Sequence, residues 1–107
     1  MSDRVRELLQ VPAKDVYFSV ASLWEICIKH SLGRLSYSAK VVSEAMKTSG
    51  FQRLAITDEH LERLVQLPPY HRDPFDRLLV AQADAEPLKL VTSDKFLACY
   101  GSSVVVV

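Results

Sequence analysis

The feature that most constrains the fold is an alternation of short β-branched or aromatic runs with longer segments of helical periodicity. Runs at residues 16–20 and 88–91 are short enough for strands, whereas the segments between such runs are long enough for helices. Strands that alternate with helices favour a parallel sheet with helices on both faces. The sequence therefore predicts an α/β fold with a mostly parallel sheet.

The individual elements follow from apolar spacing and from the residues that end helices. Strands are expected at residues 16–20, 53–56, 88–91 and 104–107. Helices are expected at residues 3–10, 21–32, 38–49, 58–67, 73–86 and 93–100. Asp73 is expected to cap the helix at 73–86, with Pro74 at the first helical position.

Two helices carry apolar residues that are expected to face the core. Every fourth position of the helix at 21–32 is apolar, at Trp24, Ile28 and Leu32. The helix at 58–67 is expected to turn four apolar residues inward, which are Leu61, Leu64, Val65 and Leu67. This spacing is typical of amphipathic helices that cover a sheet.

Composition indicates a single globular domain over residues 1–107, with 49% hydrophobic and 24% charged residues. Thirteen Lys and Arg balance thirteen Asp and Glu, so no overall positive field attracts nucleic acid, and any such contact must be local. Neither a signal-peptide run nor a membrane-length apolar stretch occurs, so a cytoplasmic protein without a membrane partner is expected. Cys27 and Cys99 have no metal-ligand spacing and are interpreted as core thiols.

Three carboxylates lie where strands end and helices begin. Glu25 is one turn into the helix after the first expected strand, Asp76 is in the first turn of the helix at 73–86, and Asp94 follows the third expected strand. In open α/β sheets the loops at this edge converge. The three carboxylates therefore form a candidate site for Mg²⁺ or Mn²⁺, which favour carboxylate oxygens.

The same acids also fit a purely structural interpretation, because acids in the first turn of a helix are stabilised by its exposed amides and dipole. Ser22 and Glu25 have capping-box spacing, and Glu25 can pair with Lys29. Asp73 and Asp76 occupy a cap and the third helical position, and Asp94 can follow a cap at Thr92 or Ser93. Spacing alone leaves both interpretations open.

Basic residues near these acids are candidates for phosphate contacts. They are His71, Arg72, Arg77 and Lys95, and the alternative is that they are solvated charges which balance the carboxylates. The three histidines of the chain share no ligand spacing, so no histidine metal site is expected.

Three segments resemble the PIN-domain family, and particularly its VapC-type toxins: SVASLWEICIKHSLGRL at 19–35, LPPYHRDPFDRLLVAQA at 67–83 and LVTSD at 90–94. The resemblance implies a three-layer fold and a metal-dependent endoribonuclease of a toxin-antitoxin pair, whose antitoxin blocks the site. It maps the acidic pocket onto Glu25, Asp76 and Asp94, with Thr92 beside the last acid. Asp73 is interpreted first as a plain N-cap before Pro74, and support of the pocket is the alternative. RNA would be the substrate, and Mg²⁺ or Mn²⁺ the cofactor.

The sequence departs from the family pattern at its beginning. The family opens with a central strand that ends in an aspartate, the first metal ligand, and the expectation here is a single PIN-like domain lacking that first strand and helix. A sheet without its central strand exposes unpaired edges, so self-association into a homo-oligomer and impaired catalysis are expected. The alternative function is a non-catalytic module that binds the antitoxin or oligomerises.

Overall fold

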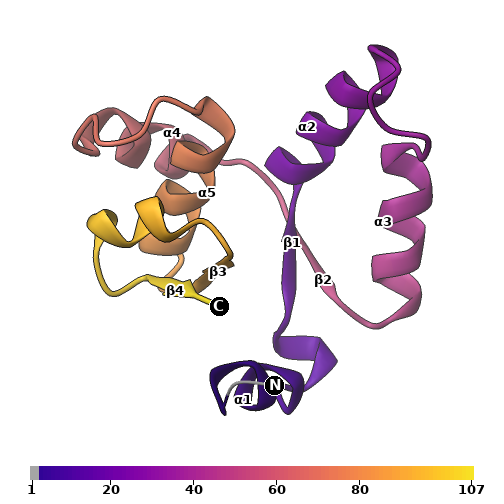
Figure 1. Ribbon diagram of the computed structural model, residues 1–107, viewed down its shortest axis with the longest axis horizontal. Coiled ribbons are helices and arrows are strands. Elements are labelled where there is room, and N and C mark those ends of the chain that lie inside the picture. Colours follow the sequence, from indigo (N-terminus) through magenta and orange to yellow (C-terminus); the bar gives the residue numbers. More distant parts are fainter. Residues whose placement is uncertain (1–2) are drawn as a thin grey trace. The chain divides into compact units, whose positions relative to one another are not determined.

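The computed structural model describes residues 3–107, and the chain forms two compact units (Figure 1). One unit comprises residues 56–107 together with the beginning of the chain as far as Val5, and the other comprises residues 6–55. The elements in chain order are α1 (Asp3–Leu9), η1 (Ala13–Asp15), β1 (Tyr17–Ser19), α2 (Val20–Ser31), α3 (Ala39–Thr48), β2 (Gln52–Leu54), α4 (Asp58–Gln66), α5 (Pro74–Ala85), β3 (Leu90–Thr92), η2 (Lys95–Tyr100) and β4 (Val104–Val106).

In the unit of residues 6–55, β1 and β2 form a parallel pair, with Ser19 opposite Leu54. The α2 and α3 helices pack against each other beside this pair (Figure 1). Strand β1 passes directly into α2 because Ser19 both ends the strand and caps the helix, its Oγ accepting the Ala21 N–H at 3.0 Å. Ser22 and Glu25 have capping-box spacing, but Ser19 is the cap, so the capping-box alternative is wrong.

The apolar stripe of α2 does not face the core. Ala21 and Leu23 are buried, whereas Trp24 is 53% exposed and both Ile28 and Leu32 are exposed. Ala21 and Leu23 lie in the first turn next to β1, so the buried face is set by the strand that precedes the helix. The core position expected for Trp24 is wrong, and Cys27 is likewise exposed rather than a core thiol.

In the unit of residues 56–107, the described core lies mainly along α5. Its buried apolar side chains are Leu78, Val80, Ala81, Ala83 and Leu97. Helix α4 packs against α5, and β3 pairs in parallel with β4, with Thr92 opposite Val106. Cys99 lies on the exposed side of η2, so the expectation of a second core thiol is also wrong.

Helix α4 turns a polar residue inward where apolar residues were expected. His60 is fully buried, whereas Leu61 is exposed and Val65 is 85% exposed. Each residue advances a helix by about 100°, so Val65 lies well away from the face that carries His60 and Leu64. The inward orientation expected for Leu61 and Val65 is wrong.

The expected order of elements and the parallel pairing are confirmed, with two parallel pairs among the described residues. Strand β3 begins two residues later than expected because the Leu88 N–H bonds the Ala83 carbonyl at 2.8 Å, at the end of α5. A three-layer arrangement, a single domain over residues 1–107 and an absent central strand stay predictions. Among residues 3–107, no helix combines the length and apolarity needed to cross a bilayer.

Candidate metal centre

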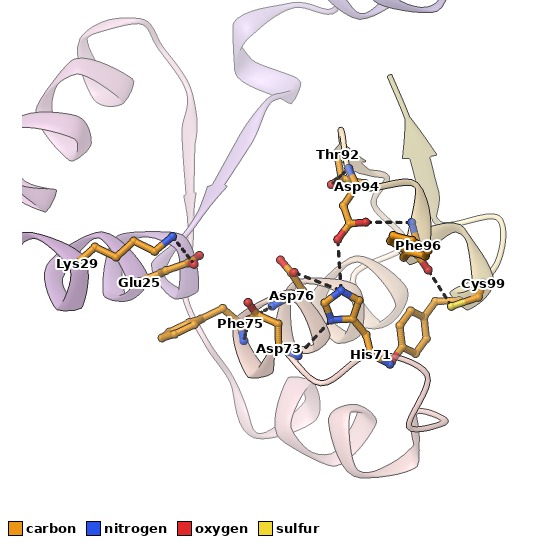
Figure 2. Close-up of polar contacts among 11 residues, drawn as sticks. Glu25, Lys29, His71, Asp73, Phe75, Asp76, Thr92, Asp94, Phe96 and Cys99 are labelled. Carbon is orange, nitrogen blue, oxygen red and sulfur yellow. Dashed lines mark hydrogen bonds and ion pairs between the residues drawn. The ribbon is translucent and has the colours of Figure 1, made fainter. Parts of the chain in front are cut away.

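Three segments of the unit of residues 56–107 bring a histidine and two carboxylates together (Figure 2). His71 lies in the loop before α5, Asp76 in the first turn of α5, and Asp94 immediately before η2. One potential ligand atom from each of the three lies within 4.8 Å of the other two. Their side chains are 21%, 29% and 35% exposed, respectively. Most of the surface of the three side chains is thus covered by protein, and the rest is accessible to solvent.

Asp76 is positioned by the start of α5. Oδ1 of Asp73 accepts the N–H groups of Phe75 at 2.9 Å and Asp76 at 3.2 Å, and Pro74 occupies the beginning of the helix. This geometry confirms Asp73 as the N-cap and fixes Asp76 in the first turn. Asp73 therefore supports the cluster by setting the backbone from which Asp76 projects.

Asp94 is positioned by the end of β3 and the start of η2. The Asp94 N–H donates to Oγ1 of Thr92 at 3.0 Å, and Oδ1 of Asp94 accepts the Phe96 N–H at 3.0 Å. Asp94 is therefore itself the cap of η2, and the expected cap at Thr92 or Ser93 is wrong. Thr92 instead orients the backbone of the acid. This leaves Oδ2 of Asp94 directed toward His71 (Figure 2).

His71 completes the cluster. Its Nε2 lies 3.3 Å from Oδ2 of Asp94 and 3.8 Å from Oδ2 of Asp76. Sequence reasoning assigned His71 to an RNA phosphate and missed this proximity, because Asp94 lies 23 residues away in the chain. The only local sequence signal for a role of His71 at the site was its position two residues before Asp73, the cap of α5.

The remaining basic candidates differ in their surroundings. Nη2 of Arg77 lies 3.4 Å from the Leu64 carbonyl and 3.3 Å from the Leu67 carbonyl, and donates to both at the C-terminal end of α4. These bonds favour a structural role for Arg77. Arg72 and Lys95 are exposed, and Nζ of Lys95 lies 6.0 Å from the centre of the Phe96 ring. Contacts of these residues with RNA stay predictions.

Glu25 belongs to the other unit and lies on α2. Its Oε2 is 3.0 Å from Nζ of Lys29, which confirms the expected pair one helical turn apart (Figure 2). A partly exposed pair of this kind contributes little to stability, about 0.3–0.5 kcal/mol. The convergence of Glu25 with Asp76 and Asp94 stays a prediction.

A comparison with known families matches the PIN domain over residues 1–100, and the chain therefore belongs to the PIN-domain family. This superfamily consists generally of nucleases, and its members typically bind divalent metals. Searches of curated proteins and of solved structures returned no match. The cluster of His71, Asp76 and Asp94 thus lies within a nuclease-type domain, and two of its members are acids that the sequence had singled out.

Proposed function

We propose that this chain is a metal-dependent endoribonuclease of the VapC toxin type, which hydrolyses RNA phosphodiester bonds in the cytoplasm. The observation that carries the proposal is the meeting of Asp76 and Asp94 in one cluster within a PIN domain. These two residues come from segments 18 positions apart, so a role as unrelated helix caps does not account for their proximity. Glu25 is proposed as the third acid of the same site.

The donor chemistry of the cluster fits Mg²⁺ or Mn²⁺. Both ions prefer carboxylate oxygens and keep several waters, so two or three carboxylates in a partly open site suffice. Each oxygen of Asp94 accepts one hydrogen bond from the protein, and a carboxylate oxygen can accept two, which leaves capacity toward a cation. A bound divalent ion supplies an activated water and neutralises charge on the leaving oxygen.

The side chains of this chain hold and orient, and none needs to act as a covalent nucleophile. Asp76 and Asp94 are fixed by the starts of α5 and η2, so their carboxylates are placed before substrate arrives. Because the net charge is zero, RNA attraction is local, and the exposed Arg72 and Lys95 are proposed to contact phosphates beside the site.

Protein partners belong to the proposal as well. A cognate antitoxin is expected from the toxin type, and self-association is proposed for the isolated chain. Trp24 and Ile28 on α2, together with Leu32 at its C-cap, expose an apolar stripe, and exposed apolar surface of this kind supports a protein-binding role for that helix.

The direct test is an RNA-cleavage assay with purified chain in Mg²⁺ or Mn²⁺ and in EDTA. Slow cleavage, in keeping with the impaired catalysis expected above, is predicted only with the ion, and Asp94→Asn is expected to lower its rate by about 100-fold or more, the usual scale for loss of one charge-stabilising group. Asp84→Asn is the control, because Asp84 is exposed on α5 and paired with Arg63. Equal cleavage by Asp94→Asn and the unaltered chain would refute the proposal.

A separate experiment tests the assignment of Glu25. If Glu25 belongs to the site, Glu25→Gln abolishes most cleavage, whereas Lys29→Ala, which removes only its helix partner, leaves cleavage intact. If Glu25 serves only in the helix pair, both variants show the same small loss of stability and the same cleavage as the unaltered chain. The readouts are the initial cleavage rate and the urea midpoint.

A further inference from the structure

His71 is held in place by two hydrogen bonds that do not involve the carboxylates of Asp76 and Asp94. Its backbone N–H donates to the Tyr100 hydroxyl oxygen at 3.0 Å, and its Nδ1 accepts the Asp73 N–H at 3.1 Å. The Tyr100 ring also packs against Tyr70, with the ring centres 5.4 Å apart. The loop and the imidazole ring are therefore fixed independently of Asp76 and Asp94, so the direction of Nε2 is built into the fold.

The bond from the Asp73 N–H to Nδ1 determines which ring nitrogen of His71 carries the hydrogen. A nitrogen that accepts an N–H must offer a lone pair, so in this geometry Nδ1 of His71 is the acceptor and the ring hydrogen is on Nε2. Nε2 can then donate to Oδ2 of Asp94 at 3.3 Å and also faces Asp76. An imidazole nitrogen that carries a hydrogen has no lone pair for a metal.

We propose that His71 is a positioning residue for the metal centre: its Nε2–H holds the Asp94 carboxylate toward Asp76 and is not a metal ligand. The proposal rests on the proposed function, because it assigns Asp76 and Asp94 to the ion. Both carboxylate oxygens of Asp94 accept a hydrogen bond, Oδ1 from the Phe96 N–H and Oδ2 from His71. Without His71, the Oδ2 side is free to turn toward solvent.

The Nε2–H donor orients the Asp94 carboxylate through a single hydrogen bond. A lysine or arginine in the same place would compete with a divalent cation for both carboxylates. Hydrogen-bond partners of metal ligands typically contribute about 10–100-fold to metal affinity. Loss of the Nε2–H donor should therefore weaken Mn²⁺ binding by about that factor.

Two substitutions separate the positioning role from a loop-building role. Gln places its amide nitrogen at about the reach of Nε2, and Asn places its carbonyl oxygen at about the reach of Nδ1. His71→Gln is expected to keep Mn²⁺ affinity close to that of the unaltered chain, and His71→Asn is expected to lose about 10–100-fold. Mn²⁺ titration followed by electron paramagnetic resonance gives Kd for both. The opposite order, or equal affinities for both variants, would overturn the proposal.

Nitrogen NMR of the full chain tests the same assignment without any variant. The Nε2–H form of His71 is expected before and after addition of Mg²⁺. Loss of that hydrogen, with a shift of the Nε2 resonance on Mg²⁺ binding, would show a ligand and refute the proposal. Neither readout needs RNA cleavage. Ion binding that Asp76→Asn abolishes and His71→Asn leaves unchanged refutes only the role of His71, whereas a chain that binds no ion refutes the proposed function with it.

Discussion

Asp76→Asn is expected to abolish the thermal stabilisation that Mg²⁺ or Mn²⁺ gives to the unaltered chain. The ligand atoms of Asp76, Asp94 and His71 lie within 4.8 Å of one another, and two carboxylates held this close repel each other. A divalent cation relieves that repulsion and binds only the folded arrangement. At an ion concentration about a hundred times Kd, such binding stabilises by about 2.7 kcal/mol, or roughly 10 °C for a chain of this size.

The amide of Asn removes both the negative charge and an oxygen ligand from the centre while keeping the size of the side chain. Asp84→Asn is the matched control, since it makes the same chemical change on the exposed side of the same helix. Thermal unfolding of the three proteins with and without the ion decides the matter. If Asp76→Asn shows the same ion-dependent shift as Asp84→Asn, the ions bind elsewhere.

Local sequence signals were sufficient where one residue determines an element boundary. Asp73 followed by Pro74 predicted the start of α5, and the structure confirms both the cap and the position of Asp76 after it. The strand runs also predicted β1 and β3, because β-branched and aromatic residues bounded by turn and helix signals favour short strands. Their expected burial is wrong, since Tyr17 in β1 and Val91 in β3 are exposed. Element order and parallel pairing could therefore be predicted without knowledge of tertiary contacts.

Side-chain environment could not be predicted in the same way. Apolar spacing shows which residues share a helix face, but it does not show which face another element covers. The stripe around Trp24 is exposed, and Val65 on α4 is more exposed still, because the covered faces carry Ala21 and His60 instead. Apolar periodicity alone contains no information about which face of a helix becomes covered.

His71 in the metal centre and His60 in the core both make contacts with residues far away in the chain. His71 meets an acid 23 residues away, and His60 meets Glu86 26 residues away. No local motif encodes such a distance. Ligand spacing therefore excluded a histidine metal site, and His71 was expected only as a phosphate contact. Both histidines are fixed in the same manner, with Nδ1 accepting a backbone N–H and Nε2 next to a carboxylate.

His60→Ala is expected to destabilise the unit of residues 56–107 by about 3 kcal/mol, the sum of a cavity and of polar groups left without partners. His60 is fully buried on α4. Its Nδ1 accepts the Thr57 N–H at 3.1 Å and faces the Gln82 amide at 3.3 Å, and its Nε2 lies 2.6 Å from Oε2 of Glu86. Substitution removes the Nδ1 acceptor of the Thr57 N–H, which faces the buried Gln82 amide, and with it half of the capping box of α4.

Urea unfolding measures this loss, and two variants separate its causes. Val65→Ala, on the exposed side of the same helix, is expected to stay within about 0.5 kcal/mol of the unaltered chain. Glu86→Gln is expected to cost less than about 1 kcal/mol, since water reaches this partly exposed side chain and the Gln carbonyl still accepts the Nε2–H. The large effect should therefore follow the buried ring and not its charged partner. Equal losses for His60→Ala and Val65→Ala would mean that the helix pair of α4 and α5 is held by apolar packing alone.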